Sequence, residues 1–234
     1  MRVKYLSDKR ILALICLNAG LYVVFLIIDI TAAVRSLAAP AGPWAFAADC
    51  LKYAGIISCL FICIFALSQE RGRVARLQAF VLAFTLAADF LLLFTQFFTA
   101  GLLIFLAAHI CALIRYRPRF ILPACVCAGV VSLIAGLALN LPPPAVIACI
   151  YAVLIISVTV STFFAEQPEI NAFFSRLGMC LFIICDINVA IFNSASPGLT
   201  VHTASSVLMW AFYLPAQTLL ALSATTFRNP RVIQ

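Results

Sequence analysis

The chain has 234 residues, of which 65% are hydrophobic and only 10% are charged. A soluble domain carries about a quarter charged residues and about half apolar ones, so this composition excludes a water-soluble globule and indicates an integral membrane protein. The net charge of +7 then concerns topology and anionic lipid rather than nucleic acid, because the basic residues are scattered and form no patch interleaved with aromatic residues.

Eight apolar runs of the length that crosses a bilayer, about 20 residues, follow one another along the chain. The predicted transmembrane helices cover 11–34, 46–67, 76–95, 98–115, 120–139, 144–166, 171–194 and 201–226. Clusters of proline, glycine and charged or polar residues separate most of them, at 40–43, 71–73, 117–119, 142–144, 167–169 and 196–198. The sequence therefore predicts an all-α polytopic bundle that forms one membrane domain over 1–234, without a soluble domain.

The basic residues fall mainly on one side of these spans. One face receives Arg2, Lys4, Lys9, Arg10, Arg71, Arg73, Arg76, Arg115, Arg117, Arg119, Arg176, Arg228 and Arg231. Arg35 alone falls on the other face, and Lys52 lies within the second span. Because short loops rich in Arg and Lys stay in the cytoplasm, this asymmetry predicts that both termini are cytoplasmic. We expect a bacterial inner membrane, with a eukaryotic internal membrane as the alternative.

Ten cysteines and two histidines set limits on metal and redox chemistry. The cysteines fall in apolar segments and form no CxxC pair, which favours packing residues over disulfides or metal ligands. Two histidines are too few for a three-His zinc site. Serine-hydrolase elbows and phosphate-binding loops of the GxxxxGK[ST] type are absent from the sequence. We therefore expect neither a metal nor a cofactor.

Two aspartates lie deep inside apolar spans. Asp89 follows Arg76 by 13 residues and Asp186 follows Arg176 by 10, which is about 19 Å and about 15 Å along an ideal helix. Both spans run in the same direction, so the two carboxylates are expected at similar depth. An ionisable residue in the membrane marks a functional site by default, and a hydrogen bond that holds helices together is the alternative.

Other polar residues share the membrane interior. Lys52 follows Asp49 by three residues, close enough to face it on one helix, whereas Asp29 is expected in a structural role near the interface. His109 lies on the fourth span, and Tyr213 and Gln217 lie one turn apart on the eighth. Taken with the two deep aspartates, this set predicts a polar cavity among the helices.

Several stretches resemble the YhhN-like family of membrane proteins, which includes the lysoplasmalogenases. The likeness is carried by "DCLKYAGI", "AADFLLL", "GLLIFLAAH", "LGMCLFIICDINVAIF" and "YLPAQTLLALS", in the family's order, from about residue 46 to 224. Ala88 and Cys185 stand where glycine and serine commonly precede the two acids, and Ala112 where a tyrosine often occurs.

The resemblance implies hydrolysis of the vinyl-ether bond of lysoplasmalogens, which releases a fatty aldehyde and a glycerophospho-alcohol. Asp89 and Asp186 would be the catalytic pair, one as acid and one as base, because two carboxyls in a poorly solvated pocket can hold different protonation states. Lys52, His109, Tyr213 and Gln217 would support the site or bind substrate. Expected partners are the lysophospholipid substrate and membrane lipids, without nucleic acid.

Two other functions fit the same residues. Buried Asp and His also form proton relays, so a proton-coupled transporter is one alternative. A lipid-binding bundle without catalysis, in which the polar residues only hold helices together, is the other.

Overall fold

The computed structural model describes residues 5–6, 8–36, 44–69, 72–116, 121–194, 198–225 and 227–228. Eight helices make up most of it: α1 (Lys9–Ser36), α2 (Trp44–Gln69), α3 (Arg73–Phe94), α4 (Phe98–Tyr116), α5 (Ile121–Ala138), α6 (Pro143–Phe164), α7 (Glu169–Phe192) and α8 (Leu199–Leu222). All eight are long and apolar enough to cross a membrane. The predicted all-α class and the count of eight spans are therefore confirmed, and no predicted end is off by more than four residues.

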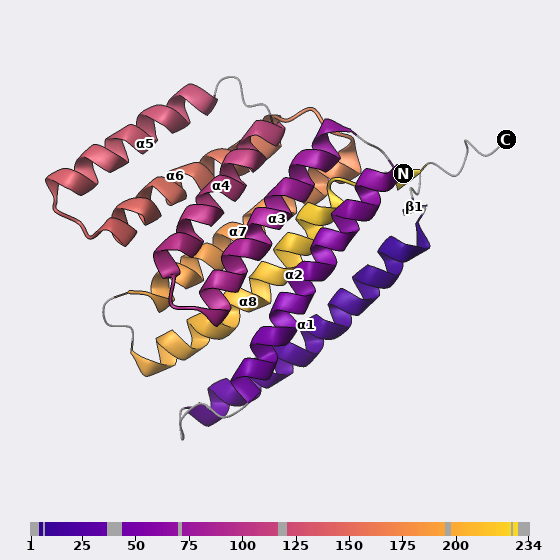
Figure 1. Cartoon of the computed structure of the whole chain (residues 1–234), viewed down its shortest axis with the longest axis horizontal. Coiled ribbons are helices and arrows are strands. Elements are labelled where there is room, and N and C mark those ends of the chain that lie inside the picture. Colours follow the sequence, from indigo (N-terminus) through magenta and orange to yellow (C-terminus); the bar gives the residue numbers. More distant parts are fainter. Residues whose placement is uncertain are drawn as a thin grey trace.

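The helices pack side by side as an up-and-down bundle (Figure 1). Consecutive helices form the pairs α1–α2, α3–α4, α5–α6 and α7–α8, and α8 also packs against α1, α2 and α3. Figure 1 shows α1 and α5 at opposite edges of the bundle, and these two are the least buried of the eight. The other six helices are more buried than these two, so the interior of the bundle lies among them.

The first and last described segments lie at the same end of the bundle (Figure 1). Two short strands, β1 (Tyr5–Leu6) and β2 (Phe227–Arg228), pair antiparallel there, as an even number of spans requires. We call this the terminal end. Arg73 and Arg176 donate to backbone carbonyls at the same end, and Arg35 lies in the last turn of α1 at the other.

The cytoplasmic location of the terminal end stays a prediction. Six of the basic residues on which it depends lie outside the described residues, namely Arg2, Lys4, Arg71, Arg117, Arg119 and Arg231. The predicted breaks at 40–43 and 117–119, and most of the one at 196–198, lie outside them as well.

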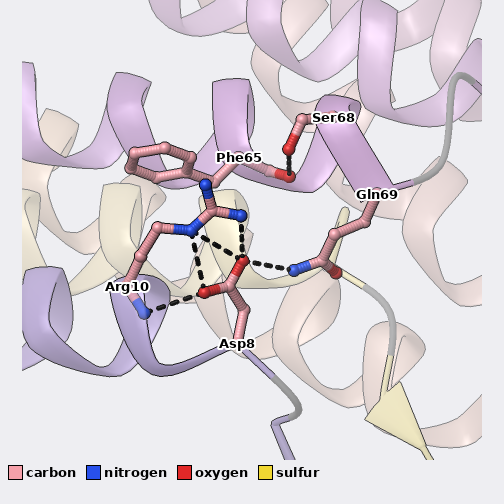
Figure 2. A network of polar contacts seen from close by, with 5 residues as sticks. All are labelled: Asp8, Arg10, Phe65, Ser68 and Gln69. Carbon is pink, nitrogen blue, oxygen red and sulfur yellow. Dashed lines mark hydrogen bonds and ion pairs between the residues drawn. The ribbon is translucent and has the colours of Figure 1, made fainter.

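A carboxylate fastens α1 to α2 at the terminal end (Figure 2). Asp8 accepts hydrogen bonds from the Arg10 guanidinium at 2.8 Å, from the Arg10 backbone N–H at 2.8 Å, and from the Gln69 amide at 2.9 Å. These contacts, the Arg10 side chain first, hold the pKa of Asp8 well below its usual range. The Arg10 guanidinium also lies over the Phe65 ring, 4.6 Å from its centre.

Small residues bring α7 and α8 close together. A Cβ added at Gly178 would lie 3.2 Å from the Ala216 carbonyl oxygen and 3.0 Å from the Leu220 side chain. Such close approach increases van der Waals packing between the helices, which drives their association in lipid, where no hydrophobic effect acts between them. It also sets the position of α8, which carries several of the polar residues considered next.

Candidate functional site

Asp89 lies in the bundle interior and is held by a tyrosine from a distant part of the chain. Its side chain is 4% exposed on α3. The Tyr213 hydroxyl on α8 donates to both carboxylate oxygens, at 3.0 and 2.8 Å. Among the described residues Asp89 has no cationic partner. The Asp89 carboxyl group is therefore hydrogen-bonded by a neutral donor. A cation in the same place would hold the group in its ionised form.

Asp186 has the same kind of partner, on another pair of helices. The Tyr151 hydroxyl on α6 donates to Asp186 Oδ2 on α7 at 2.7 Å, and again no cation pairs with the carboxylate in the described part of the chain. Asp89 lies five residues before the end of α3 and Asp186 six before the end of α7. The two carboxyl groups therefore lie at similar depth, nearer the end of the bundle opposite the termini.

Five rings connect the two Asp–Tyr pairs. This aromatic cluster contains Phe105 and His109 of α4, Tyr151, Phe182 of α7 and Tyr213. His109 lies 5.1 Å from Tyr151 and 5.2 Å from Phe182, measured between ring centres, and Phe182 lies 5.5 Å from Tyr213. Phe105 contacts both tyrosine rings at 6.4 to 6.5 Å. The two carboxyl groups thus border one aromatic cluster although their helices are α3 and α7.

His109 is fixed in one tautomer by the backbone. Its Nδ1 lies 2.9 Å from the carbonyl oxygen of Phe105, one turn earlier. A carbonyl only accepts hydrogen bonds, so Nδ1 carries the proton and Nε2 of the neutral ring keeps its lone pair. No hydrogen bond to Nε2 occurs among the described residues. The imidazole therefore offers an acceptor inside the aromatic cluster.

Gln217 adds a second acceptor one turn from Tyr213. Its side chain is 1% exposed, and its Oε1 is buried without a hydrogen-bond partner in the described part of the chain. Leaving a buried amide oxygen unpaired costs about 1–3 kcal/mol, so a bound hydroxyl or water would satisfy it.

Lys52 belongs to a separate ionic cluster. Its Nζ lies 3.0 Å from Asp29 Oδ2 and 3.1 Å from Asp49 Oδ1, so the expected Asp49–Lys52 contact is present. Asp29, expected near the interface, pairs across helices with this lysine, which is only 7% exposed in its side chain. The contacts of Lys52 are with these two acids and not with Asp89 or Asp186.

Trp210 joins the Lys52 cluster to the aromatic cluster. The Lys52 ammonium lies 5.1 Å from the centre of the Trp210 ring, and that ring meets Tyr213 edge-on at 5.2 Å. A cation over an indole face is an attractive contact. Trp210 therefore forms a chain of contacts from Lys52 to Tyr213, while Lys52 makes no described hydrogen bond to the carboxyl group that Tyr213 holds.

The sequence hypothesis did not include Tyr151 or Trp210. A signal for Tyr151 existed in its depth: it follows the start of α6 by eight residues, about 12 Å, at the same end of the bundle where Asp186 lies about 9 Å from the end of α7. No comparable signal marks Trp210, because its importance comes from two side chains on other elements.

Comparison with known proteins gives one match. The model of the YhhN family matches residues 49–224, which takes in Lys52, Asp89, His109, Tyr151, Asp186 and Gln217. No curated protein and no solved structure matches the chain.

Proposed function

Because the chain belongs to the YhhN family, we propose that it is an intramembrane hydrolase of lysoplasmalogen-type lysophospholipids. The reaction adds water across the vinyl-ether bond and yields a fatty aldehyde and a glycerophospho-alcohol. The observation that supports this most directly is the pair of carboxyls, the buried Asp89 and the part-buried Asp186, each held by a tyrosine and bordering one aromatic cluster.

The chemistry requires an acid that can deliver a proton to carbon. One carboxyl group protonates the vinyl carbon distant from the ether oxygen, and the adjacent carbon becomes an oxocarbenium ion. Water adds to that carbon and gives its proton to the second carboxylate. The resulting hemiacetal breaks its bond to the glycerol oxygen, which takes the proton held by the second carboxyl group. The hemiacetal hydroxyl gives its proton to the first carboxylate as the aldehyde forms and leaves, so both carboxyl groups return to their starting states. Atoms balance as one substrate plus one water.

The tyrosine partners suit this exchange of roles. A lysine or arginine beside Asp89 or Asp186 would hold the carboxylate ionised and unable to act as an acid. Tyrosine hydroxyls donate a hydrogen bond without adding charge, so each aspartate can be protonated or deprotonated. The apolar rings around them keep out bulk water, which strengthens electrostatic stabilisation of the cationic intermediate.

The remaining polar residues have supporting roles in this proposal. The unprotonated Nε2 of His109 accepts a hydrogen bond from the attacking water, and Gln217 Oε1 accepts one from a substrate hydroxyl. Tyr213 positions Asp89, and Lys52 acts through Trp210 by fixing the Tyr213 ring.

The test is an assay of aldehyde release from lysoplasmenyl-ethanolamine by purified protein. Wild type is expected to release aldehyde, and Asp89→Asn and Asp186→Asn are each expected to lower the rate by about 10²–10⁴-fold, the usual contribution of a general acid or base. Asparagine keeps the shape and the acceptor oxygen, so the tyrosine contacts survive. Asp49→Asn is the matched control, because Asp29 still pairs with Lys52 in that variant.

Each other outcome identifies a different function. Proton-driven substrate flux in liposomes without aldehyde release would replace the hydrolase by a transporter. Variants that lose thermal stability, with no chemistry in the wild type, would leave a lipid-binding bundle.

A further inference from the structure

A groove at the terminal end of α7 takes no part in the proposed reaction. It has a volume of about 430 Å³ and is lined by Gln167, which precedes α7, and by one face of α7 from Glu169 to Cys180. The α7 residues that line it recur at intervals of three and four, so they form a single stripe. Asp186 lies six residues beyond the last of them, in the part of α7 that borders the aromatic cluster.

Two hydrogen-bond donors in the groove have spare capacity. Among the described residues the Arg176 guanidinium makes two hydrogen bonds of 3.4 Å, from Nε to the Thr162 oxygen and from Nη2 to the Phe163 oxygen, although it carries five N–H groups. It also lies over the Phe163 ring, 5.5 Å from its centre. Gln167 accepts from Ser175 through Oε1, and its buried Nε2 has no partner among the described residues. A guanidinium beside a free amide N–H is a recognition pair for phosphate oxygens.

The groove also carries an opposite charge. Glu169 lies seven residues before Arg176 on the same face, about 10 Å along the axis. Arginine side chains lean toward the N-terminus of their helix, and the Arg176 contacts with the end of α6 show this direction. The groove therefore presents one cation and one anion on the same face of α7, which match a ligand that carries both an anion and a cation.

The deeper part of the groove is apolar and faces outward. Phe173 is 59% exposed and Leu177 is 38% exposed, and both lie on a helix that spans the membrane. Glu169 and Arg176 lie within the first eight residues of α7, with Ala172 and Phe173 between them, and Leu177 and Cys180 continue toward the membrane centre. A ligand with a charged head and a hydrocarbon chain fits this order.

We propose that the groove binds a zwitterionic phospholipid from the leaflet at the terminal end. Arg176 and Gln167 hold the phosphate, Glu169 lies beside the ammonium group, and one hydrocarbon chain runs along Phe173 and Leu177 toward Cys180. An anionic headgroup is disfavoured because it has no ammonium group to place beside the Glu169 carboxylate. This site does not depend on the proposed hydrolase activity, since it uses none of the residues of that reaction.

Native mass spectrometry of the full chain tests the proposal, with phosphatidylethanolamine and phosphatidylglycerol of identical acyl chains as probes. Wild type is expected to retain phosphatidylethanolamine more strongly than phosphatidylglycerol. Arg176→Gln should weaken phosphatidylethanolamine binding by about tenfold, the effect of losing one charge-assisted phosphate contact, and Glu169→Gln should shift the preference toward phosphatidylglycerol. Arg73→Gln is the control, because Arg73 donates to a backbone carbonyl at the same end but lies outside the groove.

Three results would overturn the proposal. One is phosphatidylethanolamine binding by Arg176→Gln within twofold of wild type. Another is a wild-type preference for phosphatidylglycerol, which would mean a general anionic-lipid surface. Because Arg176 also contacts the end of α6, Cys180→Trp provides an independent variant that fills the apolar part and leaves both charges in place. Unchanged lipid retention by that variant is the third result.

Discussion

Replacing Lys52 with methionine removes the one cation of a buried three-residue ionic cluster. The Lys52 side chain is 7% exposed, and those of Asp29 and Asp49 are 14% and 31% exposed. Methionine preserves most of the volume, so the variant removes the charge together with the ammonium contact on the Trp210 ring. Both carboxylates lie about 3 Å from the same ammonium nitrogen, and without it they face each other.

The expected loss of stability follows from that geometry. Removing one partner of a buried ion pair costs about 3–5 kcal/mol, because the other charge stays buried without compensation. Asp49 is near a third exposed and reaches solvent, so most of the cost falls on Asp29, and we expect about 3 kcal/mol. The double variant Asp29→Asn/Lys52→Met removes the stranded charge and should regain about 1–2 kcal/mol relative to Lys52→Met.

Chemical unfolding in detergent micelles measures this effect, followed by tryptophan fluorescence because Trp210 lies against Lys52. Lys9→Met is the control, since Lys9 is exposed at the start of α1 and its loss should change little. The reasoning fails if Lys52→Met costs less than about 1 kcal/mol, the value of an exposed ion pair. It fails equally if the double variant is no more stable than the single one.

Three further predictions concern other parts of the bundle. Tyr151→Phe removes the hydrogen bond to Asp186; it should cost about 1 kcal/mol of stability and lower aldehyde release, and full activity would refute a positioning role. Gly178→Ala should destabilise by about 1–3 kcal/mol through overpacking, whereas Gly20→Ala, with no atom near the new Cβ, should not. The Arg10 side chain holds the pKa of Asp8 below its usual range. The stabilisation that the Asp8 carboxylate provides is therefore complete above about pH 4 and is lost as pH falls through the lower folded-state pKa. Thermal unfolding temperatures of wild type and Asp8→Asn should converge in acid and differ at neutral pH.

The fold followed from the sequence because one physical constraint dominates it. A segment that crosses hydrocarbon must satisfy its own backbone, so an apolar run of bilayer length becomes a helix. The ends were harder to place, as at α8, which was predicted to run to 226 and ends at Leu222. There the buried Arg115 donates hydrogen bonds to the hydroxyl and carbonyl oxygens of Ser223. A hydropathy profile cannot predict such a contact.

The candidate site was predictable only in part. Asp89 and Asp186 attract attention because each is the only acidic residue in its predicted span, 76–95 or 171–194, and their similar depth follows from counting residues. Their partners depend on which helices are neighbours, and helix neighbours are set by packing of small and large residues, such as Gly178 against α8. Tyr151 therefore emerged only from the structure. The pairing of Lys52 with Asp49 could be expected from their spacing, but its pairing with Asp29 on another helix could not.

The bundle holds two kinds of buried carboxylate, and the difference between them supports the proposed chemistry. Asp29 pairs with a cation, which stabilises one charge state and makes the group a structural element. In the described part of the chain, Asp89 and Asp186 receive hydrogen bonds only from tyrosine hydroxyls. A hydroxyl can hydrogen-bond to a carboxyl group in either protonation state at modest cost. Trp210 lies between Lys52 and Tyr213, so the cation can order the tyrosine through an aromatic ring without contacting the carboxyl group. A bundle that needed only adhesion between helices would gain more from placing Lys52 directly against Asp89 than from this separation, so the geometry favours a group that has to bind and release a proton.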